Sequence, residues 1–222
     1  AVAWRFRDRV LPPSVSIGAT LAAKFFLWPL VVWLAATRRV RTAILAVAIG
    51  FALLLATWAA IGFAGLLEYP DLLRRLERTI GEDSYTLRIV LLDAGVPATA
   101  ARAGWLLLGV LLVVGIGVLG RRGDDTGSFM VAIAAALALT PIVWLHYFAL
   151  LLVIVAIAQP SLGILWFVPL AMVLTPGSGH PTPFQTAWTL GVAAVVVLLS
   201  VRTSWVSRPV SERDPFVEAR AP

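Results

Sequence analysis

Cysteine is absent from this chain of 222 residues, and histidine occurs only twice. The first absence excludes disulfide bonds, thiolate metal sites and cysteine nucleophiles, and the second leaves little material for a zinc site. Charged residues make up 14% of the chain, whereas a soluble protein averages about a quarter. Neither a P-loop nor an HExxH or GxSxG motif is present. We therefore expect no metal and no cofactor.

Hydrophobic residues, by contrast, make up 60% of the chain. This excess predicts an all-α protein, a polytopic transmembrane helix bundle with short broken helices, in residues 1–203. Residues 204–222 are expected to form a polar cytoplasmic tail. The net charge of +6 comes from arginine clusters in short connections, which orient membrane proteins and contact lipid headgroups. No nucleic-acid-binding motif accompanies this charge, so the expected partner is the lipid bilayer and not a nucleic acid.

Lys24 is the most unusual residue, because it lies inside an apolar run, residues 15–36, that is long enough to be membrane-embedded. An ammonium group in hydrocarbon costs about 3 kcal/mol even on the lenient insertion scale. Arginines flank the run on both sides, so both of its ends are expected on the cytoplasmic side. The run should therefore form two half-helices that enter and return, with residues 24–29 near the turn. Lys24 is a candidate phosphate ligand there, unless its long side chain carries the ammonium to the interface.

Residues 42–65 and 98–120 are uninterrupted apolar spans of membrane length. The connection between them, residues 66–97, is expected on the extracytoplasmic side. Within it, residues 70–80 place leucines and arginines on opposite faces of a helix. This pattern predicts an amphipathic helix that lies on the membrane or caps the bundle.

The apolar block 128–158 is too long for one simple helix and is interrupted by a Thr-Pro pair. Proline removes a helical hydrogen bond, and it also restricts the residue before it. We therefore predict two short helices, 128–139 and 145–158, that meet at residues 140–147 (TPIVWLHY). His146 in this segment is a candidate donor to a phosphate oxygen or an acceptor hydroxyl. The alternative places it in an interfacial belt of His, Trp and Tyr side chains.

The last pair of apolar segments, 163–175 and 186–201, is also predicted to be helical. The Gly- and Pro-rich loop 176–185 joins them, and His180 in this loop is expected to be an ordinary surface residue. The acidic pair 124–125 is expected to be solvated in a short cytoplasmic turn.

Two motifs carry a resemblance to a known family. The segment AAKFFLWP at residues 22–29, with the arginine cluster and apolar span after it, and the segment TPIVWLHY at residues 140–147 resemble glycosyltransferase family 87. This family comprises polytopic GT-C enzymes, including mycobacterial polyprenol-phosphate-mannose-dependent mannosyltransferases. The resemblance covers residues 14–160, and it implies a GT-C-like fold in a bacterial plasma membrane.

The resemblance also implies an activity: transfer of a hexose, with mannose as the expected sugar, from a polyprenyl-phosphate donor to an extracytoplasmic lipid or glycan acceptor. Lys24 and the catalytic His146 would stabilise the departing phosphate. Three further residues would bind substrate and phosphate: Tyr147, Trp144 and Thr140. The general base, a carboxylate in the first extracytoplasmic loop of such enzymes, would lie in an N-terminal part missing from this chain, which begins with alanine.

Two other classes remain open from the sequence alone. A transporter or flippase-like protein also uses broken helices and a charge near the membrane midplane, although it should show two matching halves, and the sequence shows none. A non-catalytic membrane scaffold would pair Lys24 with a carboxylate in another part of the protein or in another subunit.

Overall fold

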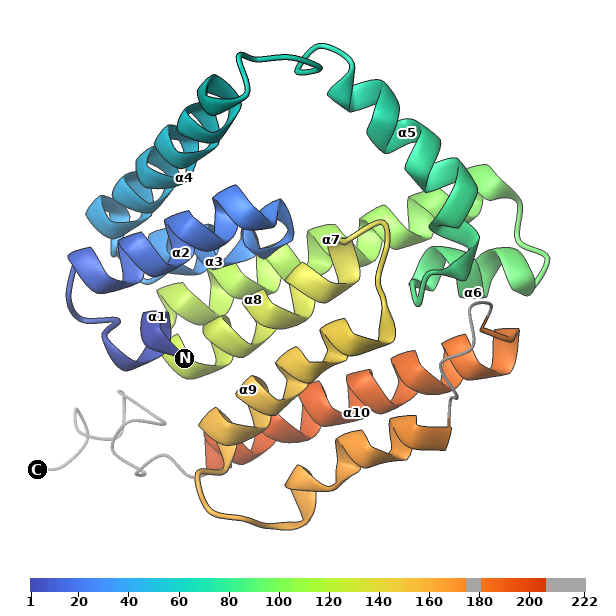
Figure 1. Ribbon diagram of the computed structural model, residues 1–222. Coiled ribbons are helices and arrows are strands. Elements are labelled where there is room, and N and C mark those ends of the chain that lie inside the picture. The colour runs from blue at the N-terminus through green and yellow to red at the C-terminus, as the bar shows by residue number, and fades with distance from the viewer. Residues whose placement is uncertain (175–180, 207–222) are drawn as a thin grey trace, which may run out of the picture.

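The computed structural model describes residues 1–174 and 181–206, and in this part of the chain the regular structure is entirely helical (Figure 1). The prediction of an all-α protein is therefore confirmed. The α-helices are α1 (Val2–Arg5), α2 (Leu11–Ala23), α3 (Pro29–Ala36), α4 (Val40–Ala60), α5 (Tyr69–Ile80), α6 (Leu87–Asp93), α7 (Ala98–Arg121), α8 (Asp125–Leu139), α9 (Leu150–Ala158) and α10 (Pro183–Val206). The 3-10 helices are η1 (Phe25–Leu27), η2 (Gly81–Asp83), η3 (Leu145–Ala149), η4 (Ile164–Trp166) and η5 (Val168–Leu174).

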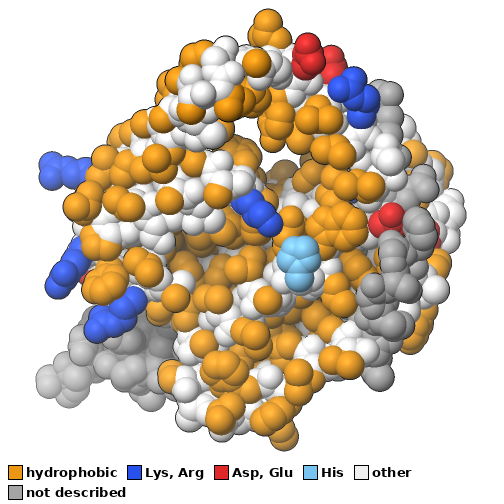
Figure 2. Space-filling view, in the orientation of Figure 1, with side chains coloured by type: hydrophobic (Ala, Val, Ile, Leu, Met, Phe, Trp, Pro, Cys, Tyr) orange, Lys and Arg blue, Asp and Glu red, His pale blue; other side chains and the backbone are white. Residues whose placement is uncertain are grey.

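Three helices of the described residues, α4, α7 and α10, are long and apolar enough to cross a membrane. Only 17% of the apolar window of α4, and the same share of α7, is buried inside the protein. Large apolar side chains such as Phe51, Leu111 and Leu198 are exposed along these helices, and hydrophobic groups dominate the surface in Figure 2. Soluble monomers rarely expose apolar area on this scale, so the structure supports a membrane protein.

The first apolar run forms the predicted hairpin of half-helices. Helix α2 ends at Lys24, whose backbone is extended (φ −152°, ψ 103°), and Pro29 begins α3. The ends of the run that carry the arginines lie together, because Arg39 after α3 forms an ion pair with Asp8 before α2 at 3.0 Å. The predicted break near residues 24–29 is confirmed.

The second predicted break is also confirmed. Helix α8 ends at Leu139, Thr140 has an extended backbone (φ −74°, ψ 124°), and the helical path resumes at η3 and continues into α9. The physical reason is the one expected from sequence, since Pro141 cannot donate a backbone hydrogen bond to an ongoing helix.

The core lies where the two broken hairpins pack together. Trp33 and Leu34 of α3 are fully buried, and Trp33 contacts Phe129 of α8 edge-on with ring centroids 4.7 Å apart. Helix α2 packs closely on α4, where the Cα of Gly18 leaves so little room that an added Cβ would lie 2.7 Å from the carbonyl oxygen of Ala46. Small residues of this kind let membrane helices approach closely.

The acidic pair 124–125 is bound by protein groups and is not simply solvated, contrary to expectation. Asp124 is 4% exposed and caps α8 by accepting the Gly127 N–H at 2.7 Å. Asp125 accepts from Arg7 at 3.0 Å, from Arg39 at 2.9 Å and from the indole N–H of Trp33 at 2.8 Å. Sequence neighbours alone suggested a surface turn, but these partners lie 86 to 118 residues away.

Helix α5 confirms the predicted amphipathic helix at residues 70–80. Its leucines at positions 72, 73 and 76 are all exposed, so this face does not cap the bundle in the described structure. The helix runs across the direction of α4 and α7 (Figure 1). That orientation is the one expected of a helix on a membrane surface.

The last apolar pair differs in part from the prediction. The first segment is helical as predicted, in the form of the 3-10 helices η4 and η5; Pro169 in η5 has no N–H to donate. Helix α10 begins at Pro183 and not at residue 186, because Thr182 and Gln185 form a reciprocal capping box, with N–H to side-chain oxygen distances of 2.8 and 3.3 Å. His180 lies outside the described residues, as does most of the tail 204–222.

Candidate functional site

The two helix breaks meet through Lys24 and Tyr147. The Nζ of Lys24 donates a hydrogen bond to the phenolic oxygen of Tyr147 at 3.3 Å, and it lies 4.6 Å from the centroid of the Tyr147 ring. These residues are 123 positions apart. The contact therefore joins two features that the sequence predicted separately.

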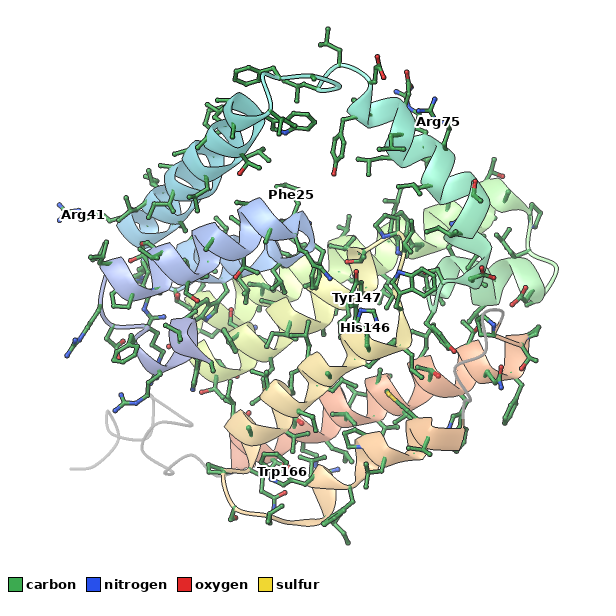
Figure 3. The ribbon with its side chains drawn as sticks, viewed as in Figure 1. Phe25, Arg41, Arg75, His146, Tyr147 and Trp166 are labelled. Atoms are coloured by element: carbon green, nitrogen blue, oxygen red, sulfur yellow. The ribbon has the colours of Figure 1, made fainter. Side chains whose placement is uncertain are left out.

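His146 flanks the same tyrosine. Its ring lies edge-on to the Tyr147 ring with centroids 4.6 Å apart, and Figure 3 shows the two side chains together at the second break. The Lys24 ammonium lies at the same distance of 4.6 Å from the Tyr147 centroid, so the ammonium and the imidazole centroid are separated by at most twice that distance. Both His146 and Lys24 are exposed, so both can reach a ligand.

The charge on Lys24 is not neutralised by a carboxylate in the structure. Lys24 is the only lysine of the chain, and none of the ion pairs within residues 1–174 and 181–206 includes it. An ammonium group carries three donors, and a phenol can donate as well as accept. Lys24 and Tyr147 thus retain donors, with the imidazole of His146 beside them, and this combination suits an anion.

Aromatic side chains shape the surroundings of the cluster. Phe26 stacks on the Tyr147 ring with centroids 5.3 Å apart and planes inclined by 8°. Phe25 is 73% exposed and points toward the space beneath the α4–α5 connection (Figure 3). Figure 2 shows the surface hollowed there, above the histidine. The cluster therefore faces a recess with apolar walls.

Ser84 holds the second break in position, a role that the sequence did not reveal. It is 1% exposed; its hydroxyl accepts the Val143 N–H at 2.7 Å and donates to the Pro141 carbonyl at 3.3 Å. The adjacent Tyr85 N–H donates to the Val143 carbonyl at 3.0 Å. Because these partners lie 57 to 59 residues from Ser84, no local sequence signal could have identified them.

Thr140 and Trp144, the other predicted ligands, are placed differently from Tyr147. Thr140 is 9% exposed, and its hydroxyl donates to the Ala136 carbonyl at 2.6 Å, which uses its proton within the last turn of α8. Trp144 is half-buried, and its carbonyl accepts the Tyr147 N–H at 2.9 Å. In this structure Thr140 and Trp144 form hydrogen bonds within the second break, whereas Tyr147 contacts Lys24.

An apolar cavity of about 400 Å³ adjoins the second break. Phe148, which follows Tyr147 in η3, forms part of its wall with side chains of α7, α8 and α10. Thr86 also lines the cavity; it is 3% exposed, and its hydroxyl has no hydrogen-bond partner among the described residues. A space suited to hydrocarbon thus adjoins the segment that carries the polar cluster.

The segment GIGVLG, residues 115–120, has the glycine spacing of a dinucleotide-binding fingerprint. That fingerprint requires a strand followed by a helix, whereas this segment lies inside α7. Gly120 instead allows close packing, since a Cβ there would lie 2.9 Å from the Cβ of Ala36 in α3.

The described residues contain no group of three or more His, Asp or Glu side chains that could hold a metal ion. Comparison with known proteins gives no match, whether to protein-family models, to curated proteins or to solved structures. The resemblance to glycosyltransferase family 87 therefore stays a prediction based on the two motifs.

Proposed function

We propose that the protein is a membrane hexosyltransferase of the GT-C type that uses a polyprenyl-phosphate-linked sugar, with Lys24 binding the phosphate of the donor. The observation that carries this proposal is the contact between Lys24 and Tyr147. It joins the two segments that resemble family 87, residues 22–29 and 140–147, into one cationic cluster. Mannose as the sugar and a lipid or glycan as the acceptor are part of the same proposal.

The chemistry follows from the charge that develops during transfer. The bond between the anomeric carbon and the phosphate oxygen breaks, and the leaving lipid phosphate gains negative charge. The ammonium of Lys24, with O–H and N–H donors on Tyr147 and His146, would stabilise that charge. The acceptor hydroxyl must lose its proton to a base, which we assign to a carboxylate outside this cluster.

The proposed arrangement in the membrane follows from the arginines. Three groups of arginines lie before α2, between α3 and α4, and after α7, at one end of the bundle because Asp125 binds both Arg7 and Arg39. Four further arginines lie in the connection from α4 to α7, at positions 74, 75, 78 and 88. We assign the end with Asp125 to the cytoplasm of a bacterium, by the preference of basic loops for that side. The chain is then multi-pass, and the Lys24 cluster lies toward the extracytoplasmic side.

A transporter is the second candidate, and the meeting of two helix breaks favours it. Transporters bind substrates where discontinuous helices come together near the middle of the membrane. Such a protein would bind the same phosphate-bearing lipid through Lys24 but would transfer no sugar.

The test is sugar transfer by the full-length gene product in detergent, with radiolabelled polyprenyl-phosphate-mannose and a panel of lipid and glycan acceptors. Lys24→Ala should lower the rate at least roughly 100-fold, as is typical when a donor to a developing anion is removed. Arg202→Ala removes an exposed cation on α10 and should leave the rate unchanged. Transfer that does not depend on Lys24 would refute the assigned role, and donor binding without transfer would favour the transporter.

A further inference from the structure

A second cationic site lies at the opposite end of the bundle from Lys24. An open pocket of about 560 Å³ between α3 and α7 is lined by Val32, Ala35, Ala36, Arg38, Gly117 and Arg121. Most of the residues that line it are small and apolar, and the two polar ones are arginines. Both arginines are exposed, and neither takes part in an ion pair of the described residues.

The backbone of Arg38 is unusual. Its φ of +63° lies in the left-handed region, which helix ends normally fill with glycine or asparagine. A side chain at such a position carries a conformational cost, and strained residues of this kind cluster at binding sites. Arg38 lines the pocket, and glycine at this position would relieve the strain but supply no charge.

The exposed face of α7 leads from the pocket along the bundle. Val110 and Val114 precede Gly117 by seven and three residues, so the three positions lie on one helix face, and both valines are more than half exposed. Arg121 follows Gly117 by one turn on the same face. The face is thus apolar over about 10 Å at helical rise and ends in a cation.

We propose that this pocket binds an anionic phospholipid, with its phosphate held by Arg38 and Arg121 and an acyl chain along Val114 and Val110. Charge complementarity and the continuous apolar face select such a lipid, because arginine forms paired hydrogen bonds with phosphate and basic pockets between membrane helices bind anionic headgroups. The proposal requires that the chain lies in a membrane. It does not depend on sugar transfer, and the residues involved are separate from the Lys24 cluster.

The pocket can be altered without changing its charge. A Cβ added at Gly117 would meet no atom within 4 Å, and the same holds for Gly191 on α10. Gly117→Leu should therefore fill the pocket while the helix stays intact, and Gly191→Leu is the matched control outside it. Arg38→Gly removes the charge and also the strain of the left-handed backbone conformation, so this variant should fold at least as well as the wild type.

The experiment is native mass spectrometry of the full-length gene product after reconstitution with phosphatidylglycerol or phosphatidylcholine. We expect retention of phosphatidylglycerol in preference to phosphatidylcholine, and a loss of roughly tenfold in Arg38→Gly and in Gly117→Leu. Arg41→Gln, which removes an exposed cation outside the pocket, and Gly191→Leu should retain the lipid.

Equal retention of the two lipids would overturn the proposal. So would unchanged retention in Arg38→Gly and Gly117→Leu, or an equal loss in Arg41→Gln, which would indicate attraction to the basic end as a whole. Displacement of phosphatidylglycerol by inorganic phosphate alone would contradict the role of the apolar face. Sugar transfer by the Arg38→Gly variant should stay near wild type, which separates this proposal from the one on Lys24.

Discussion

At the scale of single residues, Asp125 joins several segments of the bundle. Its two oxygens accept from Arg7, Arg39 and Trp33, which belong to three different segments. Burial lowers the pKa of Arg39, but the hydrogen bonds and charges of Asp125 and Asp8 outweigh burial and raise that pKa above its ordinary value. The guanidinium of Arg39 therefore stays charged in the physiological pH range.

Asp125→Asn should lower the free energy of unfolding by about 2 kcal/mol. The substitution removes the negative charge that accepts hydrogen bonds from Arg7 and Arg39 in a partly buried setting. Thermal unfolding in detergent measures this effect. Asp71→Asn is the matched control, since the pair of Asp71 with Arg74 is exposed and should be worth less than about 1 kcal/mol. Equal effects of the two changes would show that Asp125 is not a structural centre.

At the scale of helices, α2 and α4 pack closely together through their backbones. Besides the approach at Gly18, a Cβ on Gly50 would lie 3.1 Å from the Gly18 carbonyl oxygen. The hydroxyl of Ser14 also donates to the Thr42 carbonyl at 3.1 Å. This packing fixes the half-helix that ends at Lys24 against a spanning helix.

Gly18→Ala should therefore destabilise the protein by about 1–3 kcal/mol, because the new methyl group must displace backbone and not only a flexible side chain. Gly191→Ala, at an open position of α10, should instead stabilise by up to about 1 kcal/mol through helix propensity. Thermal unfolding of both variants in one detergent gives the comparison. A neutral Gly18→Ala would mean that α2 and α4 are less closely packed than described.

The helix breaks and the spans could be predicted from sequence because their causes are local. Pro29 and Pro141 mark the breaks, and uninterrupted apolar length marks α4 and α7. The helical character of residues 163–174 could be predicted from apolar length as well, but their 3-10 form could not.

The contacts that assemble the site could not be predicted in the same way. Lys24 and Tyr147 were each singled out, but a distance across 123 residues follows from packing and not from pattern. Ser84 and Asp125 were missed for the same reason, since each looked like an ordinary polar residue in a polar connection. A buried polar residue is recognisable only once its distant partners are known.

At the scale of the whole molecule, two broken hairpins sit among three long apolar helices. The arginine-rich connections before α2, between α3 and α4 and after α7 occupy one end, and the Lys24 cluster lies away from them, whereas Arg75 lies on α5 (Figures 1 and 3). This arrangement gives the protein two polar regions separated by apolar helices, and it makes the orientation in the membrane testable.

Single cysteines can report that orientation, because the chain has none of its own. Ala94 and Arg122 are exposed just before and just after α7. An impermeant thiol reagent added to intact cells should label Ala94→Cys, whereas Arg122→Cys should react only after lysis. Labelling of both from outside, or of Arg122→Cys alone, would refute the proposed orientation. Ser84 and Thr140 would be poor reporters because both are buried.

The central claim is that Lys24 binds the phosphate of a lipid-linked sugar. The most direct measurement is acylation of Lys24 by an amine reagent, followed by peptide mass spectrometry with and without lipid. Polyprenyl phosphate should protect Lys24, the uncharged polyprenol should not, and Tyr147→Leu should weaken the protection by removing the oxygen and ring that position the ammonium. Equal reactivity with and without polyprenyl phosphate, or equal protection by polyprenol, would contradict the account.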